Sequence, residues 1–231
     1  STIEIDLSRA QEIADPKWSN YLRGVIRGFQ DLEYKLPGFD ASIVSSVPLG
    51  AGLSSSAALE CAFATLLEDL VDTVLSKATK AFLAQKAEHD FAGVPCGIMD
   101  QFASTFGMED QLILIDCRTS EPEMVPFSDP SISIIVANTK VSHDLSDGGY
   151  RTRRKETEEG LALAGKESWR DVTMEDVYAA QEKMGDRIFR RSRHVVTEIA
   201  RTAQVVEAFK SGDFSNICLL YTSDAADDNA G

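Results

Sequence analysis

The segment Val47–Glu60 combines glycines and serines in an order that suits anion binding. Gly50 and Gly52 allow the chain to bend sharply and let the backbone come close to a ligand. Ser54–Ser56 follow at the expected start of a helix, where unpaired N–H groups and the helix dipole favour negative charge. The pattern favours a nucleotide phosphate site, although many serine-capped helices that follow glycine-rich turns bind nothing.

The motif differs from the two commonest nucleotide signatures. No Gly-Lys-Ser/Thr follows the glycines, as a Walker A loop would require, and the Gly-x-Gly-x-x-Gly dinucleotide fingerprint is absent from the segment.

A second candidate is Asp100, which lies among Ile98, Met99 and Phe102. Pro95 and Gly97 interrupt regular structure just before it. A carboxylate in apolar surroundings is costly unless it has partners or a role. The residues alone leave two interpretations open, a catalytic aspartate and an aspartate that caps a short helix.

Regular elements must position these residues, and periodicity predicts where they lie. Apolar residues at helical spacing predict helices at Trp18–Gln30, Ser55–Leu70, Lys77–Phe91, Tyr150–Ala164, Met174–Met184 and Ile188–Phe209. We expect strands at Phe39–Val47, Gln111–Asp116 and Ile132–Asn138, with a further possible strand at Ser1–Leu7.

Composition restricts the partners of the chain. The 231 residues carry 37 acidic and 23 basic side chains, a formal net charge of −14, which argues against nucleic acid and acidic membranes as partners. Two basic clusters, Arg151–Lys155 and Arg187–Arg193, are interpreted as solvated helix faces that pair with nearby glutamates.

The cysteines point away from zinc and from disulfides. Cys61, Cys96, Cys117 and Cys218 form neither a Cys-x-x-Cys pair nor a cluster with histidine. Scattered thiols without a signal peptide are typical of a reduced, cytoplasmic protein. No apolar run reaches the roughly 18 residues that a membrane span needs, so we expect no membrane partner.

Three segments resemble the GHMP kinases, and among them the galactokinases. Pro48–Ala58, with its triple serine, is similar to the galactokinase form of the GHMP phosphate-binding motif. Cys96–Phe102, Cys-Gly-Ile-Met-Asp-Gln-Phe, resembles the segment that carries the catalytic aspartate. Tyr150, followed by Arg153 and Arg154, resembles a sugar-contacting segment. The resemblance covers roughly residues 18 to 216, in the order of the family.

The resemblance implies transfer of the ATP γ-phosphate to the C1 hydroxyl of α-D-galactose. It implies that the phosphates are bound by Gly50, Ala51, Gly52, Leu53, Ser54, Ser55 and Ser56. It further implies Mg²⁺ on Glu88 and Ser56, with Ser54 as the alternative serine, whereas the residues alone would make Glu88 an ordinary surface glutamate. Asp100 would accept or orient the hydroxyl proton, and Gly97, Asp100 and Tyr150 would contact the sugar.

The fold implied is α+β with GHMP kinase architecture. Residues 1–137 would form a domain like ribosomal protein S5 domain 2, incomplete at its start, and residues 138–217 the opening of a C-terminal α/β domain. Residues 218–231 do not resemble galactokinase sequence, and we interpret them as a non-native tail. The family's N-terminal sugar-binding motif and C-terminal glycine-rich motif are absent from these residues, which predicts an internal fragment with exposed apolar faces.

Three alternatives remain at this point. The chain could derive from another GHMP sugar kinase, for N-acetylgalactosamine or L-arabinose. It could be a non-catalytic galactose sensor, but such sensors lack a Ser-Ala pair that is present here as Ser56-Ala57. The fragment alone could also bind nothing. The resemblance to galactokinases predicts a monomer that has galactose and ATP as its small-molecule partners.

Overall fold

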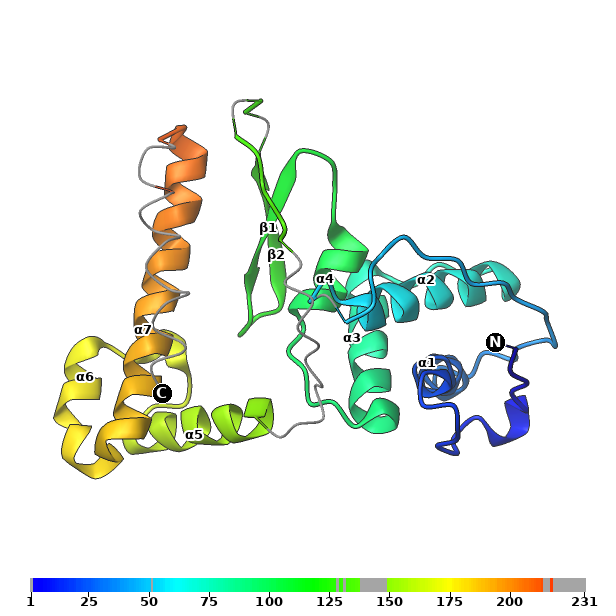
Figure 1. The fold of residues 1–231 in the computed structure, drawn as a ribbon, viewed down its shortest axis with the longest axis horizontal. Coiled ribbons are helices and arrows are strands. Elements are labelled where there is room, and N and C mark those ends of the chain that lie inside the picture. The colour runs from blue at the N-terminus through cyan, green and yellow to red at the C-terminus, as the bar shows by residue number, and fades with distance from the viewer. Residues whose placement is uncertain are drawn as a thin grey trace. The chain divides into compact units, whose positions relative to one another are not determined.

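The structure is a computed structural model that describes residues 2–50, 52–127, 129–130, 132–137, 149–213 and 217. It divides into two compact units (Figure 1), one formed by Ser1–Met108 with Ser131–Asp147 and one by Glu109–Pro130 with Gly148–Gly231. The predicted domain boundary after residue 137 adjoins the undescribed residues 138–148, and the predicted tail at 218–231 lies outside the described residues. Both therefore stay predictions.

The first unit is a cluster of helices. In chain order these are the 3₁₀ helix η1 (Leu7–Arg9), α1 (Ser19–Asp31), α2 (Ser55–Leu70), α3 (Lys77–Ala87), the π-helical turn η2 (Glu88–Ala92) and α4 (Met99–Phe106). Helix α3 begins where Ser76 accepts a hydrogen bond from the Thr79 N–H, and η2 ends at Gly93, whose φ of 72° is left-handed. Both ends agree with the predicted helix at residues 77–91.

The core of this unit lies where α1, α2 and α3 pack on one another. The apolar face of α1 supplies its centre, and Phe29 is completely buried. The core cluster takes from these helices the buried residues Leu22, Val25, Ile26, Phe29, Phe63, Ala64, Leu67, Leu83 and Ala87.

Helices α1 and α3 are tightly packed at Gly24. A Cβ atom at this position would lie 2.5 Å from the Cβ and 2.7 Å from the Cα of Ala87. We expect Gly24→Ala to destabilise the protein by about 1–3 kcal/mol, because overpacking against backbone outweighs the gain in helix propensity of about 1 kcal/mol. Urea unfolding would measure the change, with Gly38→Ala, where a Cβ meets no atom within 4 Å, as the control. A Gly24→Ala protein as stable as wild type would contradict this packing.

The second unit contains a hairpin and a helical part. Strands β1 (Gln111–Asp116) and β2 (Glu121–Pro126) pair antiparallel, with Gln111 opposite Pro126 and Asp116 opposite Glu121. The helices are α5 (Gly149–Leu163), the 3₁₀ helix η3 (Trp169–Asp171), α6 (Met174–Ala179) and α7 (Gln181–Ser211). The predicted break between the last two helices is present as a kink within α7 at Gly185, where φ is 66° and ψ is 169°.

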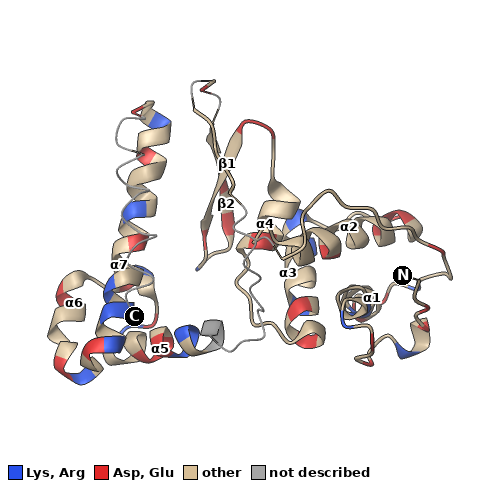
Figure 2. Cartoon of the chain, in the orientation of Figure 1, with Lys and Arg blue, Asp and Glu red and all other residues tan. Residues whose placement is uncertain are grey.

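The basic clusters of this unit are balanced by acidic neighbours (Figure 2). Arg154 pairs with Glu158 one turn along α5 at 3.1 Å, as predicted. The α7 cluster instead reaches across to α5, where the largely buried Glu156 carboxylate lies 3.0 Å from Arg187 and 3.5 Å from Arg191. These arginines therefore join two helices, and α7 does not present a purely solvated basic face.

Two predicted strands are wrong in the described residues. Residues 39–47 and 132–137 are not paired with a neighbouring strand, and the described residues 2–6 form no strand either. Phe39 packs on Phe63 with 6.1 Å between ring centroids, but Val44 is 93% exposed and Ile135 is 88% exposed. The exposed apolar faces that the sequence predicted are thus present in both segments.

Strand β2 was not predicted, because prolines and glutamates interrupt its apolar pattern. Pro122 and Pro126 remove ladder donors, but each strand of a two-stranded hairpin has a free edge that tolerates proline. Ser120 adopts a left-handed φ of 58° in the connecting turn. Of the helices that the structure describes, none combines the length and apolar composition required to span a membrane.

Candidate active site

The predicted phosphate loop leads into α2 through left-handed backbone. Gly50 and Gly52 have φ values of 68° and 72°, and a Cβ on either would meet no atom within 4 Å, so the loop is open to approach. Ser54, the N-cap of α2, is itself left-handed with φ of 53° and makes no capping hydrogen bond through its side chain. The first hydrogen bond of the helix runs from Ala58 N–H to the Ser54 carbonyl at 3.1 Å. The N–H groups before Ala58 therefore have no helical acceptor, as an anion site requires.

The two side chains predicted to hold Mg²⁺ lie in contact. Ser56 Oγ, in the first turn of α2, donates a hydrogen bond to Glu88 Oε1 at 3.0 Å. Glu88 is 3% exposed and begins the π turn η2, a kind of distortion that is frequent at functional sites. Among the described residues, Ser56 and not Ser54 is therefore the serine that bonds to Glu88. Ala51, within the same loop, lies outside the described residues.

The surroundings of Glu88 suit a cation. Burial raises the pKa of its carboxyl group, hydrogen bonds from Ser56, Cys96 and Gln101 lower it, and the negative charge of Asp100 raises it. A carboxylate and a hydroxyl are oxygen donors of the type that Mg²⁺ prefers, and Mg²⁺ commonly takes one or two carboxylates together with nucleotide phosphates. The described residues contain no group of three or more His, Cys, Asp or Glu that could hold a metal. The Glu88 carboxylate and the Ser56 hydroxyl are by themselves an oxygen donor set that suits a Mg²⁺ ion shared with phosphate.

Asp100 is the second residue of α4 and is half-buried. Two of the three apolar residues near it in the sequence, Ile98 and Phe102, are buried, whereas Met99 is 67% exposed. Ile98 is the N-cap of α4, which places Asp100 inside the first turn and not at the cap. Among the described residues no group donates a hydrogen bond to its carboxylate, so the side chain is free to meet a ligand.

The loop that carries Gly97 is anchored through the carbonyl of Cys96. His89 Nε2 lies 2.8 Å from this oxygen, and Gln85 Nε2 donates to it at 3.3 Å. Gly97 is exposed immediately after this anchor. Sequence reasoning gave His89 no role, because a bond between a side chain and a distant carbonyl leaves no pattern in the residues.

Sequence reasoning also missed Glu60, which is fully buried in α2. It lies one turn after Ser56, so both side chains share one face of the helix. Neither carboxyl oxygen has a hydrogen-bond partner among the described residues. Burial and the negative charge of Glu88 raise the pKa of Glu60 to about 9, although an interaction with the Gln101 amide lowers it. Glu60 is therefore neutral at pH 7.

This pKa makes stability depend on pH. Between the ordinary value of 4.5 and about 9, folded Glu60 keeps a proton that the unfolded chain releases, so its contribution lowers stability as pH rises through that window. We expect Glu60→Gln to remove this contribution, so that the stability of the variant relative to wild type grows between about pH 5 and pH 8. Urea unfolding across this range would measure it. Parallel pH profiles for the two proteins would contradict a neutral buried Glu60.

Tyr150 lies in α5 of the second unit. Its side chain is outside the described part of the chain, so its predicted sugar contact stays a prediction.

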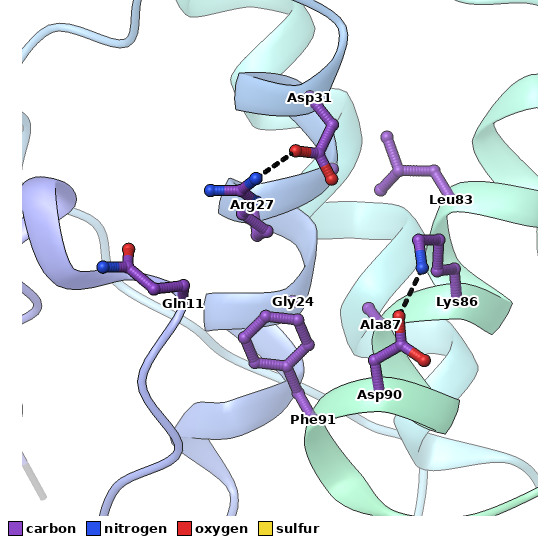
Figure 3. Close-up of a pocket in the computed structure, with 10 residues that line it drawn as sticks. Gln11, Gly24, Arg27, Asp31, Leu83, Lys86, Ala87, Asp90 and Phe91 are labelled. Atoms are coloured by element: carbon purple, nitrogen blue, oxygen red, sulfur yellow. Dashed lines mark hydrogen bonds and ion pairs between the residues drawn. The ribbon is translucent and has the colours of Figure 1, made fainter.

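A cavity of about 460 Å³ lies elsewhere in the first unit, between α1 and the α3–η2 segment (Figure 3). Its charged side chains are already paired, Arg27 with Asp31 at 2.6 Å and Lys86 with Asp90. None of the predicted site residues lines it. The cavity is therefore separate from the Ser56–Glu88 contact.

Comparisons with known proteins agree on one family. Residues 20–108 match the GHMP kinases N terminal domain. The chain is 47% identical to galactokinase from Homo sapiens over 206 residues, which cover 89% of this chain and 52% of that protein. It is 41% identical to galactokinase from Thermotoga neapolitana, over 90% of this chain and 58% of the relative. The chain thus spans about half the length of the curated relatives it matches.

A solved structure gives the same result for the fold. The crystal structure of Lactococcus lactis galactokinase complexed with galactose superposes with a TM-score of 0.84 and 31% identity, covering 97% of this chain and 59% of that one. The predicted α+β fold of GHMP kinase architecture is confirmed. The phosphate-loop segment and the helices that hold Glu88 and Asp100 all lie within the matched residues 20–108. Residues 20–108 therefore carry a GHMP kinase N-terminal domain, and the chain is similar to galactokinases over about nine tenths of its own length.

Proposed function

We propose that the full-length protein carrying this sequence is a galactokinase, which transfers the γ-phosphate of ATP to the C1 hydroxyl of α-D-galactose. The observation that carries the proposal is the contact between Ser56 Oγ and Glu88 Oε1 at the open start of α2. The similarity to galactokinases supports the choice of sugar. Because the chain spans about half of its relatives, the activity is proposed for the full-length protein.

The nucleotide phosphates would bind at the loop from Gly50 to Ser56. The positive φ of both glycines and the unpaired N–H groups of the first turn of α2 support this assignment. Leu53 and Ser55 belong to the same loop and would contribute backbone N–H groups. No cationic side chain is needed within the loop, because helix N-termini bind phosphate through their N–H groups and dipole.

Ser56 and Glu88 would hold Mg²⁺ between the protein and the phosphates. The ion would supply neutralisation of the charge on the transferring phosphoryl group. The protein contributes a carboxylate already held in place on both oxygens, by Ser56 at 3.0 Å and by Gln101 at 2.9 Å.

Asp100 would accept or orient the proton of the sugar hydroxyl, while Gly97 and Tyr150 would help seat the sugar. Asp100 is half-buried, and no described residue donates a hydrogen bond to its carboxylate, which supports a role in binding a ligand. Phosphoryl transfer depends mainly on alignment and charge stabilisation, so one positioned base suffices.

The test is a set of sugars assayed with ATP and Mg²⁺. We expect ADP release with galactose, and little with N-acetylgalactosamine or L-arabinose. Preference for either of those sugars would make the protein another GHMP sugar kinase. Binding of galactose and ATP without turnover would make it a sensor, which the intact Ser56-Ala57 pair and the Ser56–Glu88 contact argue against. The cytoplasmic location and monomeric state predicted from the sequence stay predictions.

A further inference from the structure

Gln101 has an unusual position between the two groups of the proposed site. It follows Asp100 in α4, and its side chain is fully buried. Its Nε2 donates a hydrogen bond to Glu88 Oε2 at 2.9 Å and lies 3.8 Å from Cys96 Sγ. One buried amide therefore ties the Glu88 carboxylate to the helix that carries Asp100.

The Glu88 carboxylate is held from two sides by different elements. Ser56, from α2, occupies Oε1, and Gln101, from α4, occupies Oε2. A carboxylate with a donor on each oxygen has a fixed orientation, which a metal ligand with few protein neighbours needs. The backbone of Gln101 is held as well, because its main-chain carbonyl accepts hydrogen bonds from Thr105 Oγ1 at 2.9 Å and from Cys61 Sγ at 4.0 Å.

The other end of the Gln101 amide faces a second buried group. Gln101 Oε1 is buried without a partner among the described residues, and so are both oxygens of Glu60. The Glu60 side chain is near enough to interact with the Gln101 amide.

We propose that Gln101 is a positioning residue, which fixes the Glu88 carboxylate beside Ser56 and couples it to the helix that carries Asp100. The proposal rests on the proposed function, because it assigns Glu88 to the metal–nucleotide complex. It makes Gln101 necessary for binding of metal-bound nucleotide and dispensable for binding of nucleotide alone.

The test compares the full-length wild type with Gln101→Met, which keeps the length of the side chain and removes its hydrogen bonds. Binding of ATP would be measured with Mn²⁺, as a spectroscopic probe for the metal, and again without metal. We expect the affinity for Mn²⁺–ATP to fall by about 10- to 100-fold, the usual effect of losing a residue that orients a metal ligand. The affinity for ATP alone should change little, and more Mg²⁺ should be needed for half-maximal turnover.

Gln30→Met is the matched control, because the Gln30 amide also donates a part-buried hydrogen bond, to the Leu7 carbonyl at 2.8 Å, but contacts none of the proposed site residues through it. It should leave both affinities unchanged. Gln101→Asn, which keeps an amide too short to reach Glu88, should act in the same direction as Gln101→Met. It serves as the second variant if Gln101→Met folds poorly.

The two hypotheses fail in different ways. Equal losses with and without metal would show a merely structural role and overturn the proposal for Gln101, as would unchanged Mn²⁺–ATP affinity. A wild type that does not phosphorylate galactose, combined with a selective loss of Mn²⁺–ATP binding in Gln101→Met, would overturn the proposed reaction and keep the positioning role.

Discussion

Asp100→Asn lowers kcat for galactose phosphorylation by about 10²- to 10⁴-fold in the proposed mechanism, the range that general base catalysis usually contributes. The substitution keeps the shape of the side chain and its place in the first turn of α4, but removes the group that accepts the proton. Because Asp100 is half-buried and lacks a donor among the described residues, the exchange should disturb the fold little. KM for ATP should change only slightly.

Steady-state kinetics of the full-length protein with saturating Mg²⁺–ATP would measure this effect. Asp90→Asn is the matched control, since Asp90 lies in the neighbouring turn η2 and pairs with Lys86 on the surface. It should retain nearly full activity. An Asp100→Asn protein with kcat close to that of the control would show that Asp100 is not the base.

Glu88→Gln is expected to lower turnover by at least about 100-fold, more than the loss of a residue that merely orients a ligand. The amide keeps the size of the side chain but has one oxygen and no charge for Mg²⁺. Its NH₂ group would also meet either the Ser56 hydroxyl or the Gln101 amide, both of which now donate to Glu88. Raising Mg²⁺ should restore part of the activity.

The Mg²⁺ dependence of turnover is the measurement for this variant. Glu68→Gln is the control, because Glu68 is another buried glutamate of the same unit, held by Lys80 at 2.6 Å and by the Leu75 N–H at 2.8 Å. Its replacement should reduce stability without changing the Mg²⁺ requirement. A Glu88→Gln protein with the same Mg²⁺ dependence as wild type would remove Glu88 from the metal site.

Local features of the sequence predicted the helices of the first unit well. The glycines at 50 and 52 and the serines after them mark the start of α2, and Gly93 marks the end of the π turn after α3. These signals work because helix ends need particular backbone angles and particular donors or acceptors nearby. The kink at Gly185 was predictable for the same reason.

Strands were harder to predict, because a strand exists only where a neighbour completes its hydrogen bonds. Residues 39–47 and 132–137 have suitable apolar side chains but no paired neighbour among the described residues. The prolines and glutamates of β2 disfavour a strand, yet β2 pairs with β1 because a short turn at Ser120 places the two segments side by side.

The candidate site was only partly predictable. Ser56 and Glu88 were paired through resemblance to a family, since their contact joins two helices distant in the chain. Glu60, His89 and Gln101 were missed, because a buried polar side chain is recognised by its tertiary neighbours and not by its spacing.

The central claim is that the phosphate is transferred to the anomeric hydroxyl of galactose. The most direct measurement is the ³¹P NMR spectrum of the product that the full-length protein forms from galactose, ATP and Mg²⁺. The account predicts a new phosphomonoester signal coupled to the anomeric proton, formed together with ADP. A phosphomonoester coupled to another position of the sugar, or ADP with only inorganic phosphate, would contradict it.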